Sequence, residues 1–398
     1  MSVYGIVAEY NPFHNGHKYQ IDEIRKSSDC EGIVAVMSGN FVQRGEPAIM
    51  SKYKRAQAAL KNGVDLVIEL PVQYAVSSAE RFSFSAVSIL NSLGIVDKLS
   101  FGSECGDVGK LIKAAEAVMS DTVNSEIVEQ LKEGANYPVA RMNAVEKFFG
   151  RETALILKNP NNILAVEYIK ALKKLNSNII PHTVLRVGAE HDSKKETERI
   201  ASASMIREKL LKKESIDDFI PANVLSIYKN EIGLGFAPAD IKALETAVLA
   251  SLRLKKADDF KLLPDVSEGI ENRIISASKT SGTLAELYDS AKTKRYTHSR
   301  IRRIVLYSFL GITKELQNKP PFYIRVLGFN ENGKFLLKDA KDKASLPIVT
   351  NISDIKKLNG DALKIFDFEC KATDIFNLSL PKIRQCGTDM TDNLVKIE

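Results

Sequence analysis

The stretch Val3-Tyr-Gly-Ile-Val-Ala-Glu-Tyr-Asn-Pro-Phe-His-Asn-Gly-His17 decides the fold, because it joins a strand-like run to a helix start. Residues 3–8 are rich in β-branched side chains and predict a buried strand. Pro12 fixes φ and ends the strand, Asn15 can cap a helix, and Gly16 allows close backbone approach as the helix begins. The stretch therefore predicts a strand followed by a helix N-terminus with free N–H groups.

The same unit repeats through the first hundred residues. Strand-like and helix-like runs alternate, with strands at 3–8, 32–37, 64–70 and 98–101 and helices at 16–26, 51–61 and 79–93. This alternation indicates right-handed crossovers and a parallel sheet with helices on both faces, a Rossmann-like doubly wound α/β fold. Ligands of such sheets bind beyond the carboxyl ends of the strands, so we expect the chemistry directly after each strand.

The remaining sequence divides by its pattern. Residues 107–175 are mostly helical, 178–187 predict a further strand and 202–213 a helix, so we expect an α/β domain over 1–215. Helical periodicity with few strand signals predicts a helical domain over 216–317. We expect a small mixed α/β module over 318–398, with a hairpin in which 322–329 and 334–338 flank Asn330-Glu-Asn-Gly.

Composition excludes several classes of protein. The chain has 398 residues, 44% hydrophobic and 27% charged, which is typical of a folded protein of two or three domains. No run approaches the roughly 18 apolar residues of a membrane helix, and the N-terminus lacks a basic region with a cleavage site, so we expect a cytoplasmic protein without a membrane partner. The four cysteines are far apart and show no zinc spacing, so we expect no metal site. A net charge of +6 is too small to prove a polyanionic partner.

His14 and His17 are the sharpest chemical signal. They project from the same side of the expected helix start, where imidazole and backbone N–H groups can donate to phosphate oxygens. Without context the pair is equally typical of a metal half-site or of two surface histidines, although zinc would need a third ligand and none is near. At the first strand-to-helix turn of a parallel domain, the pair resembles the H-x-G-H element of the nucleotidyltransferase and class I aminoacyl-tRNA synthetase superfamily. That resemblance implies binding of the ATP triphosphate.

Ile200-Ala-Ser-Ala-Ser-Met-Ile-Arg207 is a second candidate anion site. Ser202 and Ser204 stand where a helix would start and Arg207 lies one turn later, so hydroxyls, helix N–H groups and a guanidinium converge. The element resembles I-S-S-T-x-I-R of nucleotidyltransferases, although two alanines depart from that pattern. Taken alone, an ordinary serine N-cap with an exposed arginine is the simpler interpretation.

Further segments narrow the resemblance to one family. They follow in the order Glu9-Tyr-Asn-Pro-Phe-His-Asn-Gly-His17, Met37-Ser-Gly-Asn-Phe-Val-Gln-Arg-Gly-Glu-Pro-Ala48, Asp65-Leu-Val-Ile-Glu-Leu-Pro71, Phe101-Gly-Ser-Glu104 and Pro160-Asn-Asn-Ile-Leu164. The series resembles the bacterial tRNA(Met) cytidine acetate ligase family over residues 3–207, and more loosely to the C-terminus. The resemblance implies that ATP, with Mg²⁺, activates acetate as acetyl-adenylate, which then acetylates N4 of the wobble cytidine of elongator tRNA(Met). No obligatory protein partner is evident.

The resemblance also implies site residues. We expect His14, His17 and Lys18 to contact the phosphates during catalysis. The other implied ATP contacts are Val7, Ala8, Glu9, Tyr10, Asn11, Pro12, Phe13, Asn15, Gly16, Tyr19, Gln20, Gly102, Asn162, Arg186, Ser202, Ser204 and Arg207. From spacing alone, a turn glycine at 102 and a helix cap at 162 remain open alternatives. Glu69 and Glu104 also end strands, but a carboxylate facing a triphosphate would repel it, and we expect neither to be a catalyst.

A polar loop follows the second strand. Its residues Gly39, Asn40, Gln43 and Arg44 suit acetate or the incoming cytidine, and a purely structural loop is an equal alternative.

A basic run lies near the end of the helical region. Residues 292–303 contain six Lys or Arg, one histidine, one tyrosine and no acid. Such charges give affinity for nucleic-acid phosphates rather than sequence choice. We predict tRNA contacts from Lys294, Arg295, Arg300, Arg302 and Arg303, the alternative being a solvated basic helix.

Two other function classes share parts of this pattern. A small-molecule adenylyltransferase of coenzyme biosynthesis would have the histidine motif and the fold, but it would not need the last two hundred residues or the basic run. A non-catalytic RNA-binding protein would not need His14, Gly16, His17 and Arg207 intact.

Overall fold

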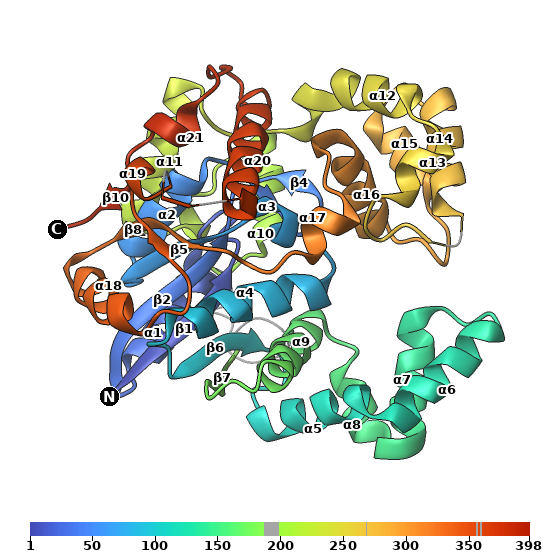
Figure 1. The fold of residues 1–398 in the computed structure, drawn as a ribbon, viewed down its shortest axis with the longest axis horizontal. Helices are drawn as coiled ribbons and strands as arrows, with labels where there is room; N and C mark the ends of the chain where they lie inside the picture. The colour runs from blue at the N-terminus through green and yellow to red at the C-terminus, as the bar shows by residue number, and fades with distance from the viewer. Residues whose placement is uncertain (187–198, 268, 356, 359) are drawn as a thin grey trace.

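The computed structural model describes residues 1–186, 199–267, 269–355, 357–358 and 360–398, and is built on a mostly parallel sheet (Figure 1). In these residues eight strands form the sheet in the order β10-β8-β5-β2-β1-β6-β7, with β9 paired to β8. The strands are β1 (Ser2–Ala8), β2 (Cys30–Ser38), β5 (Leu66–Leu70), β6 (Lys98–Ser103), β7 (Ile180–Leu185), β8 (Ile324–Phe329), β9 (Ile348–Val349) and β10 (Val395–Lys396). The predicted Rossmann-like fold is confirmed, and Val187, the last residue of the strand expected over 178–187, lies outside the described residues.

Helices cover both faces of the sheet. In β2, Val34 and Val36 pack on one face while Ile33, Ala35 and Met37 pack on the other, and all five are fully buried. Burial on both faces explains why these strands are apolar throughout rather than alternating. One face carries α4 (Ala79–Leu93), α9 (Pro160–Lys174) and α18 (Glu331–Lys343), and the other carries α1 (Asn15–Arg25), α2 (Lys52–Leu60), α10 (Ala203–Leu211) and α11 (Ala222–Leu234).

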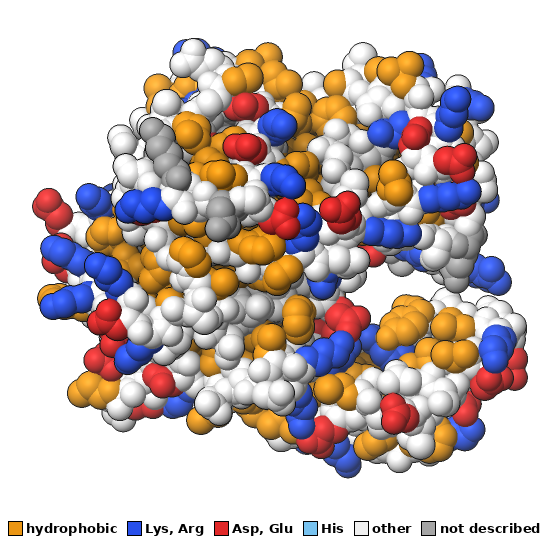
Figure 2. Space-filling model, in the orientation of Figure 1, with side chains coloured by type: hydrophobic (Ala, Val, Ile, Leu, Met, Phe, Trp, Pro, Cys, Tyr) orange, Lys and Arg blue, Asp and Glu red, His pale blue; other side chains and the backbone are white. Residues whose placement is uncertain are grey.

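Two helical lobes project from the sheet. The first lobe holds α5 (Val108–Met119), α6 (Asp121–Lys132), α7 (Tyr137–Phe149) and α8 (Arg151–Ile156). The second lobe holds α12 (Glu245–Leu254), α13 (Ala257–Lys261), α14 (Ile270–Thr280), α15 (Leu284–Ala291) and α16 (His298–Leu310), and α17 (Lys314–Asn318) follows it. A notch open to solvent separates the lobes (Figure 2). Among the described helices, none combines the length and apolar character needed to cross a membrane.

Short elements connect these parts. They are the antiparallel hairpin of β3 (Phe41–Val42) and β4 (Glu46–Pro47), the helices α3 (Val72–Ala75), α19 (Ile352–Ile355), α20 (Gly360–Asn377) and α21 (Thr388–Thr391), and the 3₁₀ turns Asp217–Phe219 and Ile241–Leu244.

The hairpin expected around Asn330 is wrong, because a strand is followed there by helix α18. The Asn330 side chain caps that helix, since its Oδ1 accepts from Gly333 N at 2.8 Å. Gly333 is required by packing rather than by a turn: a Cβ there would lie 2.0 Å from the backbone oxygen of Asp65. The pattern Asn-x-x-Gly is thus compatible with a hairpin turn and with a capped helix. The long-range contact between Gly333 and Asp65 favours the helix.

The C-terminal segment contributes to the central sheet. Strand β8 runs antiparallel to β5, and β10 pairs parallel with β8. Helix α11 likewise packs into the core beneath the sheet. The mixed strands and helices expected after 318 are present, but their sheet is shared with the N-terminal part, and the boundaries at 215 and 317 stay predictions.

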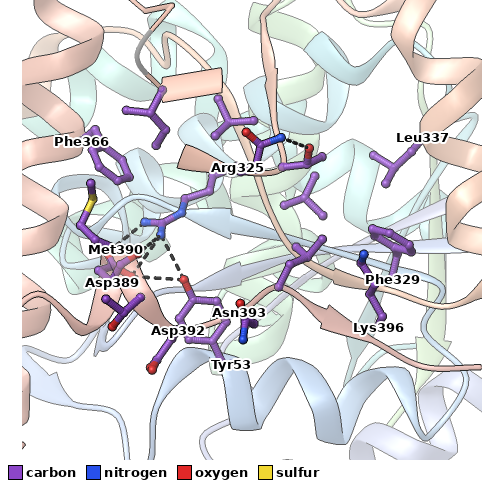
Figure 3. A pocket seen from close by; sticks show the side chains of 17 residues that line it. Tyr53, Arg325, Phe329, Leu337, Phe366, Asp389, Met390, Asp392, Asn393 and Lys396 are labelled. Carbon is purple, nitrogen blue, oxygen red and sulfur yellow. Dashed lines mark hydrogen bonds and ion pairs between the residues drawn. The ribbon is translucent and has the colours of Figure 1, made fainter. Parts of the chain in front are cut away.

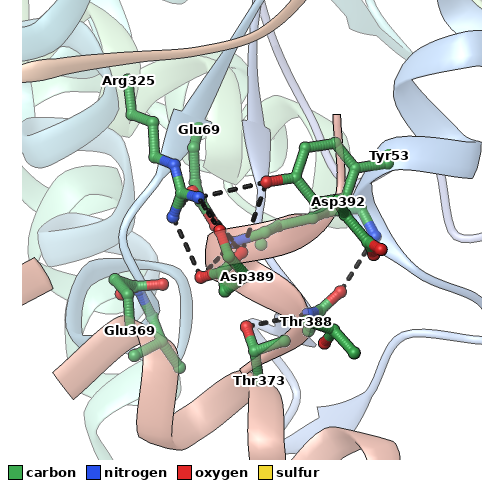
Figure 4. A network of polar contacts seen from close by, with 12 residues as sticks. Tyr53, Glu69, Arg325, Glu369, Thr373, Thr388, Asp389 and Asp392 are labelled. Atoms are coloured by element: carbon green, nitrogen blue, oxygen red, sulfur yellow. Dashed lines mark hydrogen bonds and ion pairs between the residues drawn. The ribbon is translucent and has the colours of Figure 1, made fainter. Parts of the chain in front are cut away.

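Buried charges fasten this segment to the N-terminal half (Figure 4). The ammonium of Lys52 lies 2.6 Å from Glu69 and 2.8 Å from Asp389, and Arg325 contacts Asp389 at 2.9 Å and Glu69 at 3.1 Å. Glu369 accepts a hydrogen bond from the backbone of Val72 beside them. Because each cation faces two carboxylates, the pairing offsets much of the cost of taking these charges out of water.

Candidate active site

The chain between β1 and α1 makes a sharp turn at the carboxyl edge of the sheet. Tyr10 is fully buried, and its backbone φ is 45°. Residues other than glycine seldom adopt this left-handed conformation. Neighbouring contacts hold the turn: Asn11 Oδ1 accepts from Ile49 N at 2.7 Å, and Phe13 N donates to the Tyr228 hydroxyl at 2.8 Å. Strained backbone that is this well supported is typical of functional sites.

His14 and His17 are stacked at the start of α1. Their ring centroids are 3.8 Å apart and the planes differ by 25°. His14 is the N-cap, and its Nδ1 accepts from Gly16 N at 3.0 Å, while His14 N donates to His17 Nδ1 at 3.3 Å. Since both Nδ1 atoms accept, a neutral ring at either position carries its hydrogen on Nε2.

Both rings are neutral at physiological pH. Burial, followed by the charges of Arg186 and Arg207, lowers the pKa of His14 to about 3. Burial and the neighbouring His14 hold the pKa of His17 well below its ordinary value. The pair therefore offers N–H donors to an anion rather than positive charge.

A cavity of about 320 Å³ opens beside this pair. The predicted residues that line it are Val7, Ala8, Glu9, Tyr10, Asn11, His17, Gln20, Gly102, Arg186, Gln43 and Arg44. Other lining residues come from the start of α4, the end of β6, α9 and α10: Ala79, Phe82, Phe101, Pro160, Asn161, Ile163, Leu164, Tyr168 and Ala203. Segments far apart in the sequence thus meet at the carboxyl edge of the sheet, as the topology predicts.

The second predicted anion element joins the first. Arg207 donates to Asn11 O at 2.7 Å and to Ser204 Oγ at 3.2 Å. Ser202 caps α10 by accepting from Met205 N at 3.2 Å. This is the ordinary helix-cap role that the sequence left open for the serine. The structure therefore brings Arg207 to the histidine turn, with Ser204 oriented by its guanidinium.

Other predicted contacts have structural partners outside the cavity lining. Lys18 pairs with Asp22, and Asn15 donates to Arg199 O at 3.0 Å and Asp218 O at 2.9 Å. The remaining predicted residues of the first loop that do not line the cavity are Pro12, Phe13, His14, Gly16 and Tyr19. Their contacts with ATP stay predictions.

Asn162 and Glu104 hold the end of β6 against α9. Asn162 Oδ1 accepts from the backbone N of Glu104 at 2.9 Å and of Cys105 at 3.2 Å, and the Glu104 carboxylate accepts from Asn162 N at 2.8 Å. Asn161, which also donates to Glu104, lines the cavity whereas Asn162 does not. The geometry favours a supporting role for Asn162.

The polar loop after β2 splits into two parts. Gln43 and Arg44 line the cavity, whereas Asn40 is buried between Thr373 and the backbone of Lys52. Gly39 has no room for a side chain, because a Cβ would lie 2.7 Å from the Glu69 carboxylate.

The basic helix α16 contacts the hairpin that carries Gln43 and Arg44. Arg302 pairs with Glu46 of that hairpin at 2.6 Å, and a Cβ on Gly45 would lie 2.7 Å from the backbone of Arg302. Arg303 is mostly buried and pairs with Asp265 at 2.8 Å, and Arg300 donates to Asp265 O at 3.0 Å. Of the five predicted tRNA contacts, Lys294 and Arg295 are the exposed ones.

The described residues contain no group of three or more His, Cys, Asp or Glu side chains that could hold a metal ion. Of the described residues that line the cavity, Glu9 is the only carboxylate. Mg²⁺ arriving with ATP would therefore be held chiefly by phosphate oxygens and water, as Mg²⁺ commonly is. There it would neutralise part of the phosphate charge.

Comparison with known proteins agrees with this geometry. The model of the HIGH Nucleotidyl Transferase family matches residues 1–390. The tRNA(Met) cytidine acetate ligase of Thermoanaerobacter sp. is 42% identical over 404 residues, covering 100% of both chains, and that of Acetivibrio thermocellus is 40% identical, covering 99% and 100%. The structure of Thermotoga maritima TmcAL bound with alpha-thio ATP covers 100% of both chains with a TM-score of 0.93 and 37% identity.

The chain belongs to the tRNA(Met) cytidine acetate ligase family. Four of the five segments from which the sequence predicted this family contribute residues to the cavity, the exception being residues 65–71. The similarity to the relatives confirms the prediction.

Sequence reasoning missed a residue that supports the loops beside the cavity. Arg55 on α2 is fully buried, and its guanidinium donates to the backbone oxygens of Glu9 at 2.6 Å, Ser38 at 3.0 Å and Met50 at 3.1 Å, and to that of Gly39. It therefore ties the loop after β1 to the loop after β2. In the sequence it looks like one of several surface charges on an amphipathic helix.

A cavity larger than the one beside His17 lies elsewhere, under the C-terminal segment (Figure 3). It measures about 780 Å³, and its lining includes Arg325, Asp389, Phe366 and Tyr53. Arg325 points into this cavity but is already paired with Asp389. The cavity is therefore bordered by the buried charge cluster rather than by groups free to bind a ligand. Size alone therefore does not select the active site of this family member.

Proposed function

We propose that this chain activates acetate with ATP as acetyl-adenylate and then acetylates N4 of the wobble cytidine of elongator tRNA(Met), in the cytoplasm. The observation that carries the proposal is the neutral histidine pair at the start of α1, set on a cavity at the carboxyl edge of the sheet. Relatives about 40% identical over their full length carry the same activity in their names.

The first step needs donors where charge develops. An acetate oxygen attacks the α-phosphorus, and the bond to pyrophosphate breaks with its electron pair passing to pyrophosphate. His17, with its hydrogen on Nε2, and the cation of Arg186 both line the cavity and would stabilise that charge. No covalent enzyme intermediate is required, since positioning and electrostatics suffice.

Apolar residues of the cavity suit the nucleoside end of ATP. Phe101, Leu164 and Tyr168 give the cavity apolar surface suited to a base. At Gly102 a Cβ would lie 3.1 Å from Arg186 Cγ, so glycine leaves room for the arginine side chain.

The tRNA is proposed to approach along α16. This helix is seated on the hairpin whose Gln43 and Arg44 line the cavity, so an RNA held by Lys294 and Arg295 would lie close to the cavity mouth. The target base must be unstacked to enter, as for other base-modifying enzymes.

The test is acetate-dependent exchange of labelled pyrophosphate into ATP. Replacing His17 by Ala should lower the exchange rate by about 100-fold or more, because the lost donor acts mainly in the transition state. His182→Ala is the matched control, since that histidine lies on β7 beside Ser100 and outside the cavity. Exchange that requires a coenzyme precursor in place of acetate would instead support the small-molecule adenylyltransferase, and near-normal exchange in folded His17→Ala protein would remove the histidine from the mechanism.

A further inference from the structure

The second step of the proposed reaction releases a proton. When the N4 amine attacks the acetyl carbon, a C–N bond forms and the bond between the acetyl carbon and the phosphate oxygen breaks. AMP leaves with that electron pair, and the nitrogen must lose one proton. An acceptor near the cavity would therefore accelerate this step, typically by about 10²–10⁴-fold.

Most side chains of the cavity cannot accept that proton. His17 uses Nδ1 to accept from His14 N and carries its hydrogen on Nε2. Arg44 and Arg186 are cations, and burial raises the pKa of Tyr10 and of Tyr168, which keeps both phenols protonated.

Glu9 differs from these side chains because it is a carboxylate that can accept a proton. It is the only carboxylate among the described residues that line the cavity. Its Oε1 accepts from Gln43 N at 2.8 Å, which orients the group, and Oε2 has no hydrogen-bond partner among the described residues. Burial raises the pKa of Glu9, while the Gln43 N–H and the charges of Arg207, Arg44 and Arg55 oppose that rise.

The location of Glu9 suits the second step. Strand β1 lies between β6, whose end contributes to the apolar surface suited to a base, and β2, whose following hairpin carries Gln43. Glu9 reaches toward that hairpin, which in turn is seated on α16. A cytidine arriving along α16 would therefore reach the Glu9 side of the cavity first.

We propose that Glu9 is the proton acceptor of acetyl transfer: its carboxylate takes the proton lost by the cytidine N4 amine and later releases it to water. The inference rests on the proposed function. It assigns the Glu9 side chain to the transfer step, in place of the ATP contact that the family resemblance implies for this residue.

The test compares three reactions of Glu9→Gln, in which the glutamine oxygen can still accept from Gln43 N. Acetate-dependent pyrophosphate exchange should stay within about threefold of wild type, whereas acetyl transfer to tRNA should fall by about 10²–10⁴-fold. Hydroxylamine, which is unprotonated at neutral pH and needs no enzymic base, should still capture the acetyl group at the wild-type rate. Glu31→Gln, at the amino end of β2 and exposed, is the matched control.

The outcomes separate the hypotheses. Equal loss of exchange and transfer would assign Glu9 to binding ATP or magnesium, and wild-type transfer would remove it from catalysis, so either result overturns the proposal. If wild-type protein shows no acetate-dependent exchange, the proposed function fails first. If Glu9→Gln does not fold, Glu9→Asp keeps a carboxylate but withdraws it from the cavity, and it should slow transfer while leaving exchange unchanged.

Discussion

At the scale of single residues, His14 and His17 show that a sequence motif does not reveal the protonation state of its side chains. The sequence predicts two imidazoles at a phosphate site, and the structure adds that both Nδ1 atoms are occupied by backbone N–H groups. Burial then keeps the rings neutral. The motif thus predicts the two donors, whereas their charge follows only from the fold.

The buried neutral state of His14 makes stability depend on pH. An unfolded histidine binds a proton near pH 6.5, whereas folded His14 resists protonation until about pH 3. The unfolded chain therefore binds more protons below pH 6.5, and the free energy of unfolding falls as pH drops. We expect His14 alone to cost about 2 kcal/mol between about pH 7.5 and pH 5.

His14→Asn isolates this contribution, because asparagine can still cap α1. Urea unfolding of both proteins at the two pH values is the measurement. The variant should lose about 2 kcal/mol less than wild type on acidification. An identical loss in both proteins would mean that His14 is already protonated in the folded chain.

At the scale of elements, sequence patterning predicted most of the sheet. Helix α4 begins and ends where the periodicity places it, and the first strands match within a few residues. The error at α18 has a physical cause, because the glycine that suggested a turn instead allows backbone contact with Asp65. Contacts between residues more than 260 positions apart are invisible to local patterns.

Gly333→Ala tests that contact. A Cβ would clash with the backbone of Asp65 rather than with a flexible side chain, so the backbone itself would have to shift. We therefore expect a loss of about 3 kcal/mol in the free energy of unfolding. Gly233→Ala in α11 is the control, since nothing lies within 4 Å of its Cβ and alanine favours helix by about 1 kcal/mol. Chemical denaturation of both variants measures the difference. Equal stability of the two would show that α18 can shift away from β5.

The basic run over residues 292–303 contains binding charges before α16 and structural charges on α16. Lys294 and Arg295 are exposed, whereas Arg303 pairs with Asp265 and Arg302 with Glu46. Replacing Lys294 and Arg295 by Ala should therefore weaken tRNA binding without unfolding the lobe. The slope of log affinity against log salt should fall by roughly two units, one for each lost phosphate contact.

Titration of tRNA at several salt concentrations measures both effects. Lys338→Ala with Lys341→Ala on α18 is the control, since these exposed lysines lie across the molecule from α16 (Figure 1). Acetate-dependent exchange should be unchanged in both double variants. An unchanged slope in the variant that lacks Lys294 and Arg295 would make this stretch a solvated surface.

At the scale of the whole molecule, the buried charges decide how the ends of the chain meet. Lys52 and Asp389 are 337 positions apart, yet they touch without solvent. Nothing in the sequence distinguishes them from surface charges, because their burial depends on the packing of α20 and α21 against α2 and β5. The active-site edge of the sheet and this cluster are neighbours, since a Cβ on Gly39 would touch Glu69. The C-terminal segment thus supports the loop that borders the cavity.

Glu369 sets the charge balance of this cluster. Two cations, Lys52 and Arg325, face the carboxylates of Glu69 and Asp389, so a third carboxylate is in excess. Burial, reinforced by the charge of Glu69, raises the pKa of Glu369 to about 8. The folded protein therefore holds a proton that the unfolded chain releases near pH 4.3, and the contribution of Glu369 to stability falls as pH rises from about 4.3 to 8.

Glu369→Gln should remove that dependence, because glutamine is neutral at every pH and its oxygen can still accept from Val72 N. We expect the variant to be more stable than wild type by on the order of 2 kcal/mol or more at about pH 8, with the difference shrinking toward pH 5. Urea unfolding at the two pH values is the measurement, and Glu331→Gln on the exposed start of α18 is the control. A stability difference between the variant and wild type that is the same at both pH values would show that Glu369 is ionised in the folded chain, which would require a further cation or water at the cluster.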